Sequence, residues 1–196
     1  MRGGTRDVLI LPLDGGPVAE VAKTSMQEML GRWSPDGRSL AYNELGPRGG
    51  IWVSRRGADG TWSPGRRIAN GFFASWSPDS RFISHSTGLF FGGLAVVAAD
   101  SSQTRTLYDG TRPGAPVAEM SSWSDDGQTL YFKSHSATGA AAIWSVPFAG
   151  GEPRRVLDLG DGRLRADRYS FRIAHGRLYY TLLDRQSNVW VMAVEK

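Results

Sequence analysis

Short apolar segments separated by turn residues recur along the chain. Four such segments are Ile51–Val53, Leu94–Val96, Ile143–Ser145 and Val189–Val191, and each follows a large aromatic residue by 18 or 20 positions. Short apolar runs bounded by Gly, Pro, Asp and Ser are typical of β-strands. Helical periodicity is confined to Ser25–Leu30, which we expect to be a short link. The pattern therefore predicts an all-β protein.

The aromatic residues belong to a repeated ten-residue segment. It reads Gly-Arg-Trp-Ser-Pro-Asp-Gly-Arg-Ser-Leu at Gly31–Leu40 and returns at Ala74–Ile83 and Ser121–Leu130. A fourth, altered copy places Phe171 seven residues before Leu178. The four anchors are spaced 43, 47 and 48 residues apart and are Trp33, Trp76, Trp123 and Phe171. A fixed period of this length indicates a repeat architecture.

The N-terminal segment fits the same register. Val8–Leu13, with two glycines after it, matches Ile143–Phe148 with its own glycine pair, and Val21 falls 13 residues after Val8. The chain is therefore expected to open in the middle of a repeat.

Each copy is expected to fold as four short strands. Ser-Pro-Asp-Gly supplies a tight turn between the first two, because Pro presets φ, Asp bonds its own backbone and Gly accepts positive φ. Four strands in about 40–45 residues is the signature of a propeller blade. We therefore predict a β-propeller of four-stranded antiparallel blades, divided into a partial blade at 7–24, blades at 31–70, 73–110 and 119–158, and a partial blade at 168–196.

The repeat resembles a known family. Trp-Ser-Pro-Asp-Gly-Arg-x-Leu followed by Ile-Trp-Val is similar to the WD-related propeller repeat of TolB, over nearly the whole chain. Similar repeats are found in the propellers of prolyl-oligopeptidase-type peptidases and in sensor regions attached to bacterial serine/threonine kinases. The last segment, 184–192, resembles the final blade of the kinase-attached group. The resemblance implies a fold, and one fold hosts many activities.

The repeat register leaves the closure of the ring open. It gives about 17 strands, more than four blades and fewer than five. The N-terminal piece supplies third and fourth strands and the C-terminal piece supplies first to third strands, so the third is duplicated. We expect the C-terminal portion of a larger propeller, with open edges through which copies self-associate. The alternative is a ring of five sheets with one incomplete blade.

Composition narrows the classes of partner. Cysteine is absent, which excludes disulfides, thiolate metal sites and a cysteine nucleophile. The net charge of +4 comes almost wholly from arginines interleaved with acids, whereas a nucleic-acid surface gathers them on one face. We expect no nucleic-acid partner, no signal peptide and no membrane span. The residues themselves give no location, and the resemblance implies a periplasmic or extracytoplasmic one if the chain is part of a larger precursor.

Catalytic motifs are missing. The sequence contains no Gly-x-Ser-x-Gly elbow, no kinase signature and no phosphate-binding loop with its Lys. His85, His135 and His175 occupy three different places in the repeat, so a shared metal site is not expected. The repeated acids Asp36, Asp79 and Asp126 allow a calcium interpretation but are better explained as turn formers. We predict no enzyme activity, no cofactor and no metal.

Loops at the mouth of the propeller channel are the remaining candidates for function, because binding residues favour variable loops on a rigid scaffold. The candidate binding residues are Arg32, Phe72, Phe73, Phe90, Phe91, His135 and Arg168. The aromatic pairs are either exposed anchors or a plug over a blade edge. The residues assigned to the structural core of the repeat are Trp33, Trp76, Trp123, Phe171, Trp52, Trp144 and Trp190.

These observations predict a non-catalytic propeller that binds or senses a protein or small ligand at the channel mouth. The alternative is an accessory propeller of an enzyme, either the sensor region of a bacterial serine/threonine kinase or the gating domain of a prolyl-oligopeptidase-type peptidase. A self-contained propeller lyase is disfavoured because no acid–base cluster is present.

Overall fold

The computed structural model describes residues 6–47, 49–89, 92–135, 140–159 and 164–184 of the 196-residue chain. These residues form strands joined by turns and bends, with no helix among them. The described part of the chain therefore offers no helix that would cross a membrane.

Three sheets of four antiparallel strands form the body of the molecule, and in each of them the strands pair in sequence order. Sheet A contains β3 (Gln27–Trp33), β4 (Ser39–Leu45), β5 (Gly50–Arg55) and β6 (Arg66–Ala69). Sheet B contains β7 (Phe72–Trp76), β8 (Phe82–Ser86), β9 (Leu94–Ala98) and β10 (Thr104–Tyr108). Sheet C contains β11 (Ser121–Trp123), β12 (Thr129–His135), β13 (Ala141–Pro147) and β14 (Arg154–Asp158).

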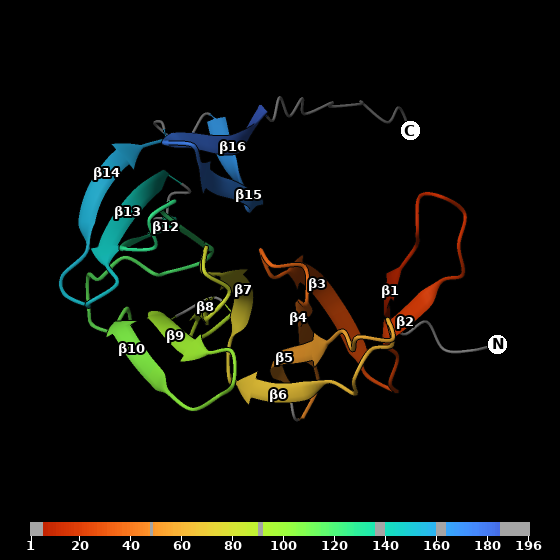
Figure 1. Cartoon of the computed structure of the whole chain (residues 1–196). Helices are drawn as coiled ribbons and strands as arrows, with labels where there is room; N and C mark the ends of the chain where they lie inside the picture. Colours follow the sequence, from red (N-terminus) through yellow and green to blue (C-terminus); the bar gives the residue numbers. More distant parts are fainter. Residues whose placement is uncertain (1–5, 48, 90–91, 136–139, 160–163, 185–196) are drawn as a thin grey trace, which may run out of the picture.

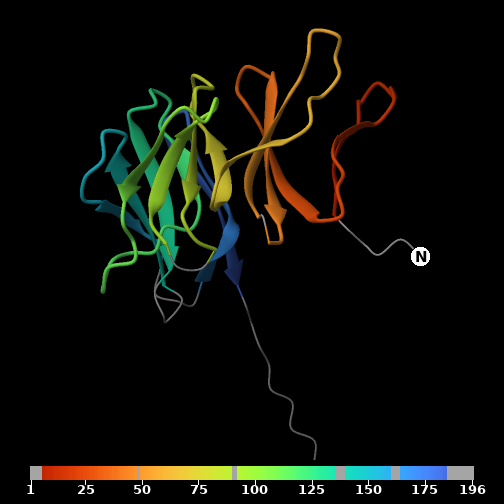
Figure 2. The ribbon, with the colours of Figure 1, turned by 90° about the horizontal axis from the view of Figure 1, so that it is seen from below.

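A two-stranded hairpin lies at each end of the series. The N-terminal hairpin is β1 (Val8–Ile10) with β2 (Ala19–Ala22), and the C-terminal hairpin is β15 (Leu164–Ala174) with β16 (Arg177–Asp184). Figure 1 shows the five sheets in an arc, with β3 and β7 toward its middle and β6, β10 and β14 at its outer side. Figure 2 shows the sheets standing side by side, with turns at both edges. This is the radial arrangement of propeller blades.

The Ser-Pro-Asp-Gly turn closes through its own side chains. In sheet A, Ser34 Oγ donates to Asp36 Oδ1 at 2.5 Å and accepts the Ser39 amide at 2.9 Å. Asp36 Oδ1 also accepts the Arg38 amide at 3.0 Å, and Gly37 has a φ of +70°. The Ser34 hydroxyl is the main reason that the pKa of Asp36 lies below its ordinary value.

Both later copies repeat this turn. In sheet B, Ser77 Oγ donates to Asp79 at 2.6 Å and accepts the Phe82 amide at 2.9 Å. In sheet C, Ser124 Oγ donates to Asp126 at 2.5 Å and accepts the Thr129 amide at 2.9 Å. The repeated aspartates therefore build turns, as their spacing indicated.

Adjacent sheets are joined through the tryptophan of the repeat. Trp76 Nε1 donates to the carbonyl of Arg32 at 2.9 Å, and Trp123 Nε1 donates to the carbonyl of Ser75 at 3.0 Å. Both rings are at most 8% exposed. Each indole therefore contacts the first strand of the preceding sheet, at the residue just before the tryptophan of that sheet. The ring buries a large apolar area there.

Trp33 departs from this rule and corrects the prediction that it is buried. Its side chain is 47% exposed and contacts Trp62 edge-on at 5.4 Å between ring centroids. The reason is that the N-terminal hairpin contributes only two strands before sheet A. The described residues contain no sheet with a first strand before sheet A. Trp33 is therefore not covered in the way that sheet A covers Trp76 and sheet B covers Trp123.

A buried polar residue in the second strand also connects neighbouring sheets. Asn43 is fully buried, donates through Nδ2 to the carbonyl of Gly71 at 3.0 Å and accepts the Phe73 amide at 3.1 Å. In sheet B, Ser86 Oγ donates to the carbonyl of Ala118 at 2.7 Å. These side chains hold the segment that enters the next sheet, and so satisfy backbone groups that are far from water.

Two predictions about local structure are wrong. Ser25–Leu30 does not form a helical link, because β3 begins at Gln27 and pairs with β4, with an irregularity at Met29–Arg32 where Leu30 has a φ of +60°. β15 begins at Leu164, before the expected boundary at 168, and its hairpin ends in a two-residue turn at His175 and Gly176. Cross-strand pairing overrides local periodicity in the first case.

Candidate binding cavity

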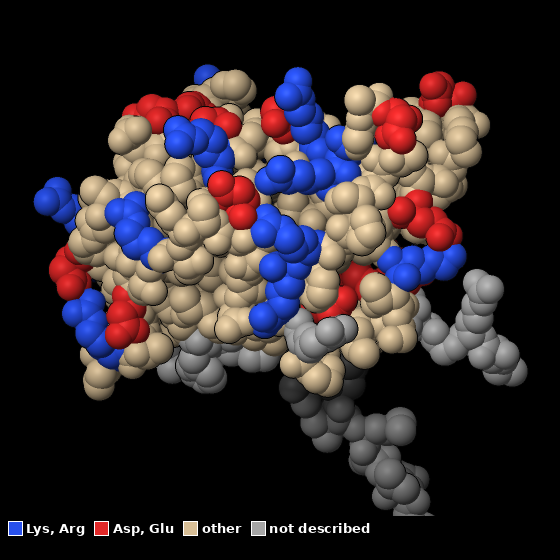
Figure 3. Space-filling model, turned by 60° about the horizontal axis from the view of Figure 1, so that its bottom comes forward, with Lys and Arg blue, Asp and Glu red and all other residues tan. Residues whose placement is uncertain are grey.

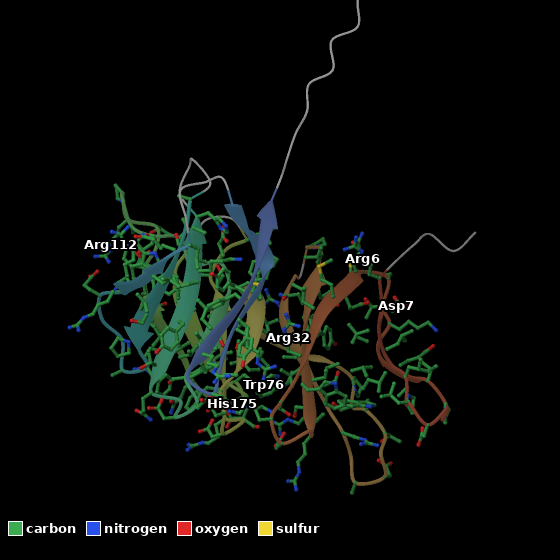
Figure 4. All side chains as sticks on the ribbon, turned by 90° about the horizontal axis from the view of Figure 1, so that it is seen from above. Arg6, Asp7, Arg32, Trp76, Arg112 and His175 are labelled. Carbon is green, nitrogen blue, oxygen red and sulfur yellow. The ribbon has the colours of Figure 1, made fainter. Side chains whose placement is uncertain are left out.

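A cavity of about 780 Å³ lies among the first strands of the sheets. Its walls come from β3, β7, β11 and β15 and from the turns that follow them. Figure 4 shows Arg32, Trp76 and His175 gathered near the middle of the molecule, where these strands meet. The walls of the cavity therefore combine strands of the scaffold with the turns that follow them.

Hydroxyl groups line the cavity but are already used to join strands. Ser122 Oγ accepts the amide of Ile173 at 2.9 Å and lies 3.5 Å from the carbonyl of the same residue. Ser121 Oγ lies 2.9 Å from Ser84 Oγ. These serines fasten β11 to β15 and to β8, which fixes the width of the cavity.

The charged groups of the cavity are mainly basic. Arg32 and Arg172 are exposed and line it, together with His175 from the tip of the last hairpin and the carboxylate of Asp125. Among the described residues neither guanidinium has an ion-pair partner. An arginine fork without a partner is well suited to bind a carboxylate or phosphate.

Both arginines interrupt the repeat. The residue before the anchor is Ser75 in sheet B and Ser122 in sheet C, but Arg32 in sheet A. The residue after the anchor is a serine in all three full copies, but Arg172 after Phe171. Sequence reasoning missed Arg172, although its departure from the repeat was the signal that would have found it.

The three histidines lie in three environments. His85 is 2% exposed, burial lowers its pKa, and its Nε2 has no hydrogen-bond partner among the described residues. His135 Nδ1 lies 2.6 Å from Glu119 Oε2, and His175 lines the cavity. Within the described ranges, no three His, Asp or Glu side chains come together in a way that would hold a metal ion.

The predicted binding residues are dispersed. Arg32 lines the cavity from β3, not from a loop, and Arg168 lies within β15 rather than in the connecting loop assigned to it. His135 ends β12 and is 15% exposed against Glu119. Among the members of this set whose side chains the structure describes, only Arg32 lines the cavity.

Of the two alternatives for the aromatic pair at the start of β7, the structure agrees with a plug over a blade edge rather than with exposed anchors. Phe73 has a φ of +61°, is 6% exposed and packs with Met120 and Phe171, and Phe72 is partly buried against the same cluster. These two rings pack in the hydrophobic cluster where sheet B, sheet C and the C-terminal hairpin meet. Phe90 and Phe91 lie outside the described residues.

The remaining tryptophans of the third strands differ from one another. Trp144 is partly buried against the cluster between sheets B and C, and Arg155 lies over its ring. Trp52 is partly buried, and its indole nitrogen has no hydrogen-bond partner among the described residues. Trp190 lies outside the described residues.

Basic side chains also gather on the outer surface. Figure 3 shows Lys and Arg grouped near the middle of the visible face, with acidic side chains around them. At the seam between sheets A and B, Arg55 and Arg66 both donate to the carbonyl of Ala99, at 3.3 and 3.4 Å. Arg66 also donates to Ser101. Arg55 and Arg66 therefore join sheet A to sheet B, which is a structural role.

Comparison with known proteins identifies the fold. No protein-family model matches the chain, and no curated protein matches it. Among solved structures, it is similar to a prolyl endopeptidase (14% identity, TM-score 0.61, 85% of this chain and 27% of the other). It is also similar to TolB from Acinetobacter baumannii (18%, 0.58, 90% and 45%) and to the β-propeller domain of the Trilobed protease from Pyrococcus furiosus (11%, 0.50, 72% and 45%).

These identities are low enough that the likeness concerns fold alone. The chain spans less than half the length of each of these proteins. The sheets, their antiparallel order and the neighbours together confirm the predicted fold class: the protein is a β-propeller of four-stranded blades.

Proposed function

We propose that this protein is a non-catalytic propeller module that binds an acidic ligand in its central cavity. The observation that supports the proposal is the pair Arg32 and Arg172, which stand where the repeat has serine and line the same cavity. A hydrogen bond to a charged group contributes about 1.5–3 kcal/mol, and two forks on a rigid wall select for a carboxylate or phosphate.

The test is calorimetric binding of an acidic peptide. Poly-glutamate of defined short length is titrated into the protein, with the matching glutamine peptide as the neutral probe. The variants Arg32→Ser and Arg172→Ser replace each arginine with the serine that the other copies of the repeat have at that position. The substitution therefore removes the charge with a residue that the same strand already accepts in those copies. Each is expected to weaken binding of the acidic peptide by about tenfold to a hundredfold.

The matched control is Arg56→Ser, which removes the same charge outside the cavity, where Arg56 is exposed. It is expected to leave binding nearly unchanged, because screening weakens a distant surface charge. Equal losses for all three variants would mean that net charge, and not the cavity, attracts the peptide. The proposal would then be abandoned.

A second candidate is an accessory propeller in a larger enzyme. It is favoured by the similarity to prolyl endopeptidase and to the Trilobed protease domain, of which this chain spans 27% and 45%. In a peptidase such a propeller would gate substrate, and in a receptor kinase it would be the sensor region. Neither proposal involves a nucleic-acid partner.

Activity assays separate the two candidates. The isolated chain is expected to show no turnover of peptide or polysaccharide substrates. Turnover that disappears in His135→Ala or His85→Ala would overturn the non-catalytic proposal. Stimulation or restriction of a separate peptidase by the added chain, without turnover by the chain itself, would favour the accessory role.

A further inference from the structure

The two hairpins at the ends of the arc leave strand edges unpaired. Among the described residues, β1 pairs only with β2 and β16 pairs only with β15. Large apolar side chains are exposed on both strands: Leu9 and Leu11 are 51% and 67% exposed, and Tyr179 and Tyr180 are 50% and 41% exposed. An unpaired edge that carries exposed apolar side chains favours pairing with a further strand.

The pairing of β1 identifies it as a third strand of the repeat. In sheets A, B and C the third strand pairs with the fourth through a register irregularity beside Ile51, Leu94 and Ile143. β1 pairs with β2 through the same irregularity beside Val8. In the three complete sheets a second strand lies on the other edge of the third strand. That second strand is what β1 lacks among the described residues.

The pairing of β16 identifies it as a second strand. Ile173 pairs with Leu178 across the C-terminal hairpin, just as Trp33 pairs with Leu40 across the first hairpin of sheet A. Leu178 therefore takes the place of Leu40 in the repeat. A second strand needs a third strand on its other edge, and none of the described residues supplies one. Each hairpin thus carries the strand that the other hairpin lacks.

The complete sheets also give the register for such a pairing. In each of them, the residue in the place of Leu178 faces the residue three positions after the start of the irregularity. This register would set Leu178 opposite Leu11, and Tyr180 opposite Leu9. In two sheets the places of Tyr180 and Leu9 hold the facing aromatic pairs Tyr42–Trp52 and Phe132–Trp144. Large side chains facing each other across strands stabilise a sheet.

An arginine of the fourth strand joins each sheet to the next. Arg66 of sheet A donates to the carbonyl of Ala99 at 3.4 Å, and Arg105 of sheet B donates to the carbonyl of Ala149 at 3.1 Å. Arg154 holds the same place in sheet C, opposite the third strand. Its side chain is exposed, and its guanidinium makes no hydrogen bond or ion pair within the described ranges. The arginine contact is therefore incomplete after sheet C.

The turn after β1 offers the matching acceptor. Ala99 and Ala149 both lie in the turn that follows a third strand, and the corresponding turn after β1 contains Leu13 and Asp14. Asp14 is exposed. A carboxylate beside an arginine adds a charge-assisted hydrogen bond to the contact that the other sheets make through a carbonyl alone. This turn and Arg154 are therefore complementary in charge.

Trp33 supplies a third complementary group. Trp76 donates to the carbonyl of Arg32, and pairing across the hairpin places Arg172 of β15 where Arg32 lies in β3. The Trp33 ring is 47% exposed, and its N–H has no hydrogen-bond partner among the described residues. A copy of β15 beside the N-terminal hairpin would offer the carbonyl of Arg172 to Trp33.

The two hairpins of one chain do not meet. Figure 1 shows them at separate places at the two ends of the arc, with sheets A, B and C between them. The other segment that matches a third strand, Val189–Val191, lies outside the described residues. That segment would serve β16 but would leave β1 and Trp33 as they are. A second copy of the chain serves both ends together.

We propose that copies of this chain join head to tail: the edge of β1 in one copy pairs with the edge of β16 in the next, and the two hairpins together complete a four-stranded blade. The contact continues the interfaces already present between sheets A and B and between sheets B and C. Because it joins two different surfaces, it either closes into a ring of copies or extends as a chain of them. It goes beyond the proposed acidic ligand and does not rest on it.

Cysteine cross-linking tests the register of the contact. The chain contains no cysteine, so a disulfide forms only between introduced residues. Full-length Leu11→Cys and Leu178→Cys proteins are mixed and mildly oxidised. A disulfide between the two chains is expected, because residues directly opposite each other on paired strands lie within disulfide range.

The matched control replaces Leu11→Cys with Leu13→Cys. Leu13 is fully exposed, so random collision would link it at least as fast, but it lies two positions out of register. It is expected to react at least about tenfold more slowly with Leu178→Cys. Equal rates for the two mixtures would overturn the proposal.

The double variant Leu11→Cys with Leu178→Cys separates contact between copies from contact within one copy. Links between chains are expected. A disulfide within a single chain would show that the two hairpins of one copy meet, and it would overturn the proposal. The absence of any link would show that the edge of β16 is covered in another way, by residues 185–196 for example, and would overturn it as well.

A charge exchange at exposed residues tests the contact without touching the strands. Arg154→Asp and Asp14→Arg each place like charges together, and each is expected to weaken self-association about tenfold in sedimentation. A mixture of the two variants is expected to restore it, because each copy then meets the opposite charge. In the control mixture Arg56→Asp takes the place of Arg154→Asp, with the same net charge and no restoration expected. Failure of the first mixture to restore association, or a native protein that stays monomeric, would overturn the proposal.

Discussion

At the scale of the residue, the environment of the repeated tryptophan decides what it contributes. Trp76 and Trp123 each bury a ring and satisfy a carbonyl of the preceding sheet, whereas Trp33 has the same sequence neighbours and stays 47% exposed. Identical local chemistry therefore leads to different contributions to stability.

Substitution of these tryptophans tests that difference. Trp76→Phe keeps an aromatic ring but removes the donor to Arg32, and it is expected to lower the free energy of unfolding by about 2–3 kcal/mol. Trp33→Phe is expected to change it by less than about 0.5 kcal/mol. Urea unfolding followed by fluorescence measures both. Similar losses for the two variants would contradict the assignment of Trp33 as uncovered.

The turn aspartates predict a dependence of stability on pH. The hydroxyl bonds from Ser34 and Ser124 are the main causes that lower the pKa of Asp36 and of Asp126 in the folded protein. A lowered folded pKa means that the stabilisation is present above the unfolded value, 3.8, and is lost as the pH falls below it. The difference in urea midpoint between the native protein and Asp126→Asn is expected to be constant from about pH 5 to 7 and to shrink below about pH 4. A difference that grows in acid would refute this.

At the scale of the element, sheets A and B are each fastened to the next sheet by a side chain of their second strand. Asn43 satisfies the carbonyl of Gly71 and the amide of Phe73 at once, and Ser86 does part of this for the following sheet. These side chains satisfy backbone groups of the segment that enters the next sheet, at Gly71, at Phe73 where the pairing of β7 with β8 is irregular, and at Ala118.

Removal of the Asn43 amide should loosen this crossing. Asn43→Ala is expected to cost about 2–4 kcal/mol, since two buried backbone groups lose their partners. Ser86→Ala, which removes a single hydroxyl, is expected to cost about 1–2 kcal/mol. Chemical unfolding gives the cost, and amide exchange of Phe73 shows where it arises. Protection of the Phe73 amide that is unchanged in Asn43→Ala would contradict the assigned role.

At the scale of the whole molecule, the two hairpins at the ends of the arc have fewer neighbours than the sheets between them. The N-terminal hairpin and its turn leave Leu9, Leu11, Leu13 and Val18 exposed, and Trp33 beside it is uncovered. Stability in a repeat array comes largely from neighbour interfaces. The end hairpins are therefore expected to be the least stable elements.

Amide exchange and sedimentation test this expectation together. Exchange is expected to be fastest within β1–β2 and β15–β16 and slowest within β8, β9, β12 and β13 of the central sheets. Because exposed strand edges and apolar side chains pair with other copies, the mean mass is expected to rise with concentration. A monomer at all concentrations with uniform protection would show that the ends are covered in another way.

The sequence by itself determined the strands, the hairpin turns and the period of the repeat. These follow from interactions between residues close in the chain: Asp36 bonds within its own turn, and the interval from Trp76 to Ile83 sets one hairpin. They are visible in a single copy and repeat wherever the pattern repeats.

Only the tertiary structure decided which of the repeated positions are covered. Trp33 is exposed although Trp76 and Trp123 at the equivalent positions are buried, and Phe73 is buried although its place at the start of a strand allowed an exposed ring. Arg32 and Arg172 likewise line one cavity although about 140 positions separate them in the chain. The physical reason is that burial depends on the neighbouring sheet, and the spacing within one repeat carries no information about that neighbour.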